Sequence, residues 1–240
     1  MDKMSFTHHI SQQYNEELEE IRNRVMSMGG LVEEQLADAL TALVEGNTEL
    51  GEKVVTSDYK VNAAEVDLDE GCTHVLARRQ PAASDLRLIL AVVKTITDLE
   101  RIGDEAERIG RMALHLNDAD RQRSPMDEVQ AIGEQVRTML RGALDAFARM
   151  DAEQAVRVAQ EDIRVDSKYE VVLRELMQYI EEHPKAVVPV MDVIWAARSL
   201  ERIGDRARNI CEYVVYFVRG KDVRHTSFEQ MAAEATGDRH

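Results

Sequence analysis

Two acidic residues stand one helical turn apart in a six-residue string that occurs twice in the chain. The string is Leu-Glu-Arg-Ile-Gly-Asp, and it places Glu100 with Asp104 and, 101 positions later, Glu201 with Asp205. A spacing of four residues brings both carboxylates to one face of a helix, where they repel each other, and more strongly when partly desolvated. The spacing therefore predicts that a cation lies between the two acids.

A second polar pair accompanies each string. Asp58 and Asn62 match Asp162 and Asp166 at an offset of 104, and each pair again shares one helical face. If the helices that carry these pairs pack antiparallel against the helices that carry the strings, each half of the chain gathers one oxygen-rich cluster. The candidate metal ligands are Asp58, Asn62, Glu100 and Asp104 in the first cluster, and Asp162, Asp166, Glu201 and Asp205 in the second.

The chemistry of these clusters has two interpretations. Oxygen ligands without histidine or cysteine suit hard divalent cations such as Mg, Mn or Ca, carboxylate clusters also hold iron, and Zn accepts carboxylate ligands. Alternatively, the acids form a solvated helix edge, because charged helices commonly carry such spacings. Their partners would then be arginines such as Arg101, Arg111, Arg202 and Arg208. Two matched copies strengthen the metal interpretation, and both stay open.

The elements that position the acids are predicted to be helices throughout. Apolar residues recur at steps of three and four over about residues 14–43, 48–79 and 84–115, and short connections between long helices favour antiparallel neighbours. Asn47 or Thr48 is expected to cap the second helix, and Asp151 with Gln154 resembles a capping box in the second half. We therefore predict an all-α fold of two tandem antiparallel three-helix bundles related by an internal repeat. They cover residues 1–117 and 124–220, with a loose polar tail at 221–240.

Three further expectations concern packing. Small residues from Gly103 onward let a neighbouring helix approach closely. The linker near residues 116–124 holds few apolar residues, so the bundles are expected to fold as separable units. Trp195 is expected in the core, because it lies on the apolar part of its helix.

Composition limits the function classes. Forty-five acidic against thirty basic residues give a net charge of −15, which opposes binding to nucleic acid or to an anionic membrane and favours cations or basic partners. Cys72 and Cys211 are isolated, which is typical of a reducing cytoplasm. With no apparent signal peptide and no apolar run long enough to span a bilayer, we expect a cytoplasmic protein that meets membranes only through partners.

The paired strings, the segment Arg-Arg-Gln-Pro-Ala-Ala-Ser-Asp-Leu-Arg at 78–87 and the tandem layout closely resemble the PhoU family of phosphate-uptake regulators, over roughly residues 5–220. The resemblance implies two three-helix bundles, an often dimeric protein and negative regulation of the phosphate-starvation response. It also implies an adaptor that couples the ATPase of a high-affinity phosphate ABC transporter to a sensor histidine kinase. The family's acidic metal motif, Glu-or-Asp-x-x-x-Asp, maps onto Glu100 with Asp104, Glu201 with Asp205 and Asp162 with Asp166, whereas Asn62 puts an amide at the last position of the remaining pair.

Two function classes are weighed. One is the regulatory adaptor, and the other is a carboxylate-bridged metalloenzyme such as a metal-dependent phosphatase. No histidine falls at helical spacing from the acids to serve as a general acid or base, and the sequence has no phosphate-cradling glycine loop or nucleophile elbow. We therefore predict a regulator that is not an enzyme, and keep the phosphatase as the alternative.

Overall fold

The computed structural model describes residues 3–81, 83–116 and 126–237, and all regular secondary structure in these ranges is helical. The helices are α1 (Lys3–Glu45), α2 (Thr48–Ser57), α3 (Tyr59–Arg79), α4 (Ala83–His115), α6 (Met126–Arg149), α7 (Ala152–Gln160), α8 (Asp162–Glu182), α9 (Val187–Arg219) and α10 (Phe228–Thr236), with a 3-10 turn at Pro184–Ala186. The prediction of an all-α fold is confirmed. None of the helices in the described ranges combines the length and apolarity needed to cross a bilayer.

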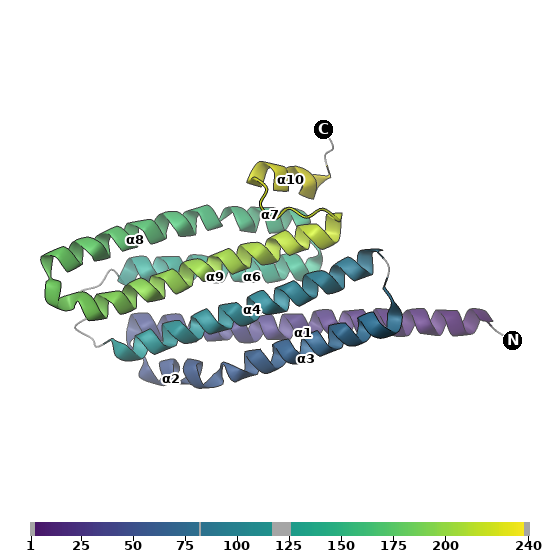
Figure 1. Ribbon diagram of the computed structural model, residues 1–240, viewed down its shortest axis with the longest axis horizontal. Coiled ribbons are helices and arrows are strands. Elements are labelled where there is room, and N and C mark those ends of the chain that lie inside the picture. The colour runs from purple at the N-terminus through teal and green to yellow at the C-terminus, as the bar shows by residue number, and fades with distance from the viewer. Residues whose placement is uncertain (1–2, 82, 117–125, 238–240) are drawn as a thin grey trace.

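The helices form two bundles that lie side by side. In Figure 1, α4 and α9 run in opposite directions across the front of the molecule, with α1 and α6 behind them. The α2 and α3 helices pack against both α1 and α4, and α7 and α8 pack against both α6 and α9. Each half is therefore a bundle of three helical rods, in tandem order as predicted.

The helix starts follow local chemistry. The side chain of Asn47 accepts a hydrogen bond of 3.1 Å from the Leu50 N–H at the start of α2, and Asp151 accepts one of 2.9 Å from the Gln154 N–H at the start of α7. Each side chain satisfies an amide that has no partner inside its own helix. Both predicted caps are confirmed.

The middle rod of each bundle is divided in two, whereas the sequence pattern predicts one continuous helix. Asp58 separates α2 from α3, and Glu161 separates α7 from α8. Both residues keep right-handed helical dihedral angles, and the Val61 N–H donates to the Asp58 carbonyl at 2.9 Å, which tightens one turn. The two divisions lie within one position of each other in the repeat, so each bundle holds an aspartate, Asp58 or Asp162, at an irregular turn.

A reciprocal packing of glycine against leucine joins the two bundles. A Cβ added at Gly133 of α6 would lie 2.5 Å from Cδ1 of Leu40 on α1, and one added at Gly29 of α1 would lie 2.8 Å from Cδ1 of Leu144 on α6. The offset of 104 relates the two glycines to each other and the two leucines to each other. Each half therefore contributes the same knob and the same hole, related by an approximate twofold rotation.

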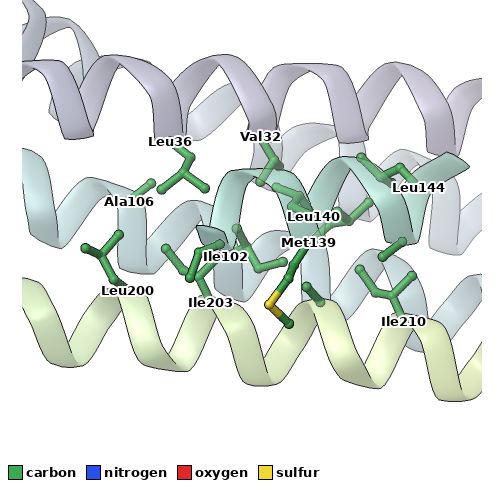
Figure 2. Packing of buried hydrophobic residues seen from close by; sticks show 14 of the residues in the cluster. Val32, Leu36, Ile102, Ala106, Met139, Leu140, Leu144, Leu200, Ile203 and Ile210 are labelled. Atoms are coloured by element: carbon green, nitrogen blue, oxygen red, sulfur yellow. The ribbon is translucent and has the colours of Figure 1, made fainter. Parts of the chain in front are cut away.

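The core is continuous across the two halves. Side chains of α1, α4, α6 and α9 converge in one cluster, in which Figure 2 shows Val32, Ile102, Leu140 and Ile203 together. The most extensive contact between any two helices is the one between α4 and α9, which belong to different bundles. This contact weighs against the expectation that the bundles fold as separable units, which rested on the linker and not on the helix faces.

Two expectations about the surface are also wrong. Ser227 and Gln230 form a capping box that starts α10, and Met231 and Ala235 of this helix are buried, with α10 packed against α7 and α9. The tail is therefore not loose at Phe228–Thr236; its short apolar stripe is hard to recognise among polar neighbours. Trp195 is 53% exposed on α9 rather than in the core.

Candidate acid clusters

The first cluster forms where the joint between α2 and α3 meets α4. Asp58 is buried, and both its carboxylate oxygens accept hydrogen bonds from amides: Gln35 Nε2 donates to Oδ1 at 2.9 Å and Asn62 Nδ2 donates to Oδ2 at 3.1 Å. Burial, and then the charge of Asp58, raises the pKa of Asp104. Burial and the neighbouring Asp104 raise the pKa of Glu100. The structure thus brings Asp58, Glu100 and Asp104 together, and Asn62 acts as a hydrogen-bond donor to Asp58.

The glycine of the repeated string explains how these side chains approach one another. A Cβ added at Gly103 would lie 3.2 Å from Gln35 Oε1 and 3.3 Å from Asp58 Oδ1, and one added at Gly204 would lie 3.3 Å from Asp162 Oδ1. These distances are tighter than ordinary van der Waals contact. A side chain at either position would push the aspartate away from the acids of the string, so the expected close approach along this stripe is confirmed.

The second cluster contains its own cations. Arg208 Nη1 donates to Asp162 Oδ2 at 2.6 Å and lies 3.7 Å from Asp205 Oδ1, and Arg198 Nη1 donates to Glu201 Oε1 at 2.6 Å. Burial is the main cause that raises the pKa values of Asp162 and Glu201, and the arginines act in the opposite direction. In this half, Arg198 lies against Glu201 and Arg208 lies near Asp205, and neither guanidinium group contacts both acids, so the prediction of one cation between them is not met by a described side chain.

The repeat shows why the two clusters differ. The first-half counterpart of Arg208 is Glu107, which pairs with Arg111 on the outside of α4. The counterpart of Gln35 is Met139, which cannot donate to Asp162. Asp162 Oδ1 and Glu201 Oε2 accordingly have no hydrogen-bond partner among the described residues, and neither has Gln35 Oε1.

These arrangements do not fit a metal ion as they stand. Within the described part of the chain, no three or more His, Cys, Asp or Glu side chains are placed to hold one. Amides occupy both oxygens of Asp58, and guanidinium groups occupy one oxygen each of Asp162 and Glu201. The carboxylate donors remain of the kind that hard cations prefer, but several of their oxygens are already engaged, by uncharged amides in the first cluster and by arginines in the second.

Gln35 is a member of the first cluster that was not predicted from the sequence. Gln35 interrupts the apolar stripe of α1 between Val32 and Leu36, and a polar residue on a core stripe is a detectable signal. Arg208 was identified only as one arginine among several that could neutralise the acids.

Two more buried acids lie between α4 and α9, and the sequence pattern gave no indication of them. Asp98 accepts hydrogen bonds from the Tyr213 hydroxyl at 2.9 Å and from Arg206 Nη1 at 3.4 Å. Glu105 accepts from the Ser199 hydroxyl at 2.7 Å and from Arg202 Nη1 at 3.0 Å. The offset of 101 relates Asp98 to Ser199 and Glu105 to Arg206, so this polar contact follows the same approximate twofold axis as the glycine–leucine packing.

Comparison with known proteins decides the family. The PhoU domain model matches residues 25–113 and 129–214, one match in each bundle. The chain belongs to the PhoU family. The chain is 54% identical over 237 residues to the phosphate-specific transport system accessory protein PhoU homolog of Pseudomonas putida. This alignment covers 99% of this chain and 93% of that protein.

Solved structures agree with this assignment. The crystal structure of PhoU from Pseudomonas aeruginosa aligns with a TM-score of 0.83 at 51% identity, covering 87% of this chain and all of that chain. The crystal structure of the phosphate transport system regulatory protein PhoU from Streptococcus pneumoniae aligns with a TM-score of 0.82 at 28% identity, covering 88% of this chain and 99% of that chain. The PhoU fold with its two tandem domains is therefore confirmed for this chain.

Proposed function

We propose that this PhoU protein is an accessory regulator of phosphate transport that represses the phosphate-starvation response. The observation that carries the proposal is the 54% identity, over nearly the whole chain, to a protein named as a phosphate-specific transport system accessory protein. The name of the Streptococcus pneumoniae structure, a phosphate transport system regulatory protein, points to the same role.

The finer proposal is an adaptor that links the ATPase of a phosphate ABC transporter to a sensor histidine kinase, in the cytoplasm and as a homodimer. An adaptor needs a rigid body with separate surfaces. The continuous core across the two bundles supplies that rigidity, because packed interiors transmit displacement and resist deformation. The acid clusters, which accept hydrogen bonds from amides in the first half and from arginines in the second, support a structural role better than proton transfer.

A reporter strain tests the regulatory role. A deletion strain that carries a reporter for phosphate-starvation genes is grown in high phosphate, with and without a plasmid copy of the wild-type gene. We expect the reporter to stay on in the deletion strain and to be repressed by the plasmid. A reporter that is fully repressed without the protein contradicts this role. A phosphatase assay with added Mn, Mg or Fe then tests the enzyme alternative.

Metal binding is a separate proposal, for iron, Mn, Mg or Zn at the acid clusters. Carboxylate oxygens support it, and for an ion to reach Asp162 Oδ2 the guanidinium of Arg208 must first leave. Elemental analysis of protein purified without chelator tests it, with the double variant Glu201→Ala, Asp205→Ala as the comparison. Unchanged metal content in that variant would show that the second cluster holds no ion.

A further inference from the structure

The outward surface of the α4–α9 pair carries a concentration of basic side chains. We call it the basic face and define it by Lys94, Arg101, Arg108, Arg202 and Arg206. Lys94, Arg101 and Arg108 recur every seven residues on α4, which keeps them on one side of the helix. Figure 1 shows α4 and α9 in front, with no other helix drawn across them. The side chains of Arg101 and Arg108 are about half exposed.

Two of the acids close to the basic face lie beneath it, and Asp222, which is exposed near Lys94, is paired with Arg224. Asp98 and Glu105 are buried between the two helices, where they accept hydrogen bonds from Arg206 and Arg202. The side chains of Arg202 and Arg206 are 46% and 34% exposed, and Arg101 Nη1 lies 4.0 Å from Asp98 Oδ1. In a chain with a net charge of −15, this surface therefore presents mainly positive charge to solvent.

Aromatic side chains extend the same surface. Trp195, the only tryptophan in the sequence, stands seven residues before Arg202 on α9 and is 53% exposed. Lys94 Nζ lies 5.5 Å and 5.3 Å from the ring centres of Tyr213 and Tyr216. Both tyrosines are partly buried, and Tyr213 donates to the buried Asp98, so Trp195 is the exposed aromatic side chain of this surface. Tryptophan and arginine are among the residues that most often dominate the binding energy of protein interfaces.

We infer that the basic face docks an acidic segment of a partner protein. This inference rests on the proposed adaptor function and specifies the chemistry of one partner surface. Charge complementarity to acidic side chains steers the encounter and selects the partner.

The width of the basic face favours a single polypeptide segment over other polyanions. Glu100 and Asp104 project from the side of α4 that faces α3, and Glu201 and Asp205 project from the side of α9 that faces α8. A flat anionic membrane or a DNA duplex would meet these acids as well as the arginines. A second copy of the chain would bring one basic face against another, which is repulsive.

The fluorescence of Trp195 measures this binding directly. The full-length protein is titrated with a short glutamate-rich peptide and, separately, with a lysine-rich peptide, phosphatidylglycerol vesicles and duplex DNA. We expect the glutamate-rich peptide alone to change the emission, with an affinity that falls as salt rises. The double variant Lys94→Gln, Arg101→Gln should weaken that affinity by about tenfold. The control variant Arg137→Gln, Arg164→Gln removes two charges from α6 and α8 and should bind as the wild type does.

Several results would overturn the inference. They are no response to the glutamate-rich peptide, an equal response to vesicles or DNA, an equal loss in both double variants, or self-association through the basic face. The reporter strain separates this outcome from failure of the proposed function. If the wild-type gene represses the reporter and the Lys94→Gln, Arg101→Gln gene represses it equally well, the regulatory role holds and the docking site is wrong.

Discussion

Arg208 Nη1 lies 2.6 Å from Oδ2 of Asp162, a carboxylate that is only 1% exposed. The arginine also lies 3.6 Å from Glu212 and 3.7 Å from Asp205. Arg208 therefore pairs with Asp162 and Asp205 from inside the same bundle, beside Arg198 on Glu201, whereas the repeat has Glu107 at the position of Arg208 in the first cluster.

Replacing Arg208 by methionine should destabilise the protein by about 2 kcal/mol, because a buried carboxylate loses its charged partner while the partly exposed position of the arginine limits the loss. Urea unfolding at pH 7 measures the change. The control is Arg164→Met, which removes an exposed pair with Glu161 and should change stability by less than about 0.5 kcal/mol. Equal effects of the two substitutions would show that the Asp162 contact contributes nothing special.

Neutralising the unpaired acids of the first cluster should have the opposite effect. Glu100→Gln with Asp104→Asn removes the repulsion between two partly buried carboxylates and Asp58, and should raise stability by roughly 1 kcal/mol at pH 7 in chelator-treated protein. The control is Glu107→Gln, which breaks an ion pair with Arg111 and should give no gain. A loss of stability in the double variant would contradict this account of the first cluster.

The stability gained by the Glu100→Gln, Asp104→Asn double variant should decrease as the pH falls. The pKa values of Glu100 and Asp104 are raised in the folded protein, so the folded state holds these protons more tightly than the unfolded chain does. This contribution makes the wild type more stable as the pH falls through the raised pKa values toward the ordinary ones of about 4. The advantage of the double variant should therefore shrink between neutral pH and about pH 4, and a gain that does not change with pH would contradict it.

The glycine–leucine contact between the bundles gives a third prediction. Gly133→Ala would place a Cβ 2.5 Å from Cδ1 of the buried Leu40 and should destabilise the protein by about 1–2 kcal/mol through overpacking. Gly30→Ala on α1 is the matched control, because nothing lies within 4 Å of its added Cβ and the helix should gain about 0.5–1 kcal/mol. Thermal unfolding of both variants measures the difference. Similar melting temperatures would mean that α6 adjusts at no cost.

The docking of α10 gives a fourth prediction. Met231→Ala should cost about 2 kcal/mol, because the side chain is buried in the contact of α10 with α7 and α9. It should also make the segment after Gly220 more sensitive to limited proteolysis. Glu234→Ala, at an exposed position on the same helix, should leave both measurements close to the wild type. Equal cleavage of the two variants would show that α10 is not held by Met231.

The sequence by itself determined the long helices, the repeat and the alignment of acids within it, but not the division of the middle helices or α10. The helices follow from apolar residues at steps of three and four, a pattern that can be read over a short stretch of chain. The repeat follows from the constant offsets of 101 and 104 between its two copies. The pairing of Asp58 with the acids of α4 was also predictable, because Gly103 marks the point where the neighbouring helix comes close.

The tertiary structure alone decided which group meets each acid. Gln35 reaches Asp58 across 23 positions of sequence and Arg208 reaches Asp162 across 46, and nothing local selects one donor from the many on these helices. The same holds for Asp98 and Glu105, which stand on α4 among other charged residues and become buried only because α9 packs over them. Helix periodicity fixes the face on which a side chain stands, whereas the charge and burial of that face depend on the helix that covers it.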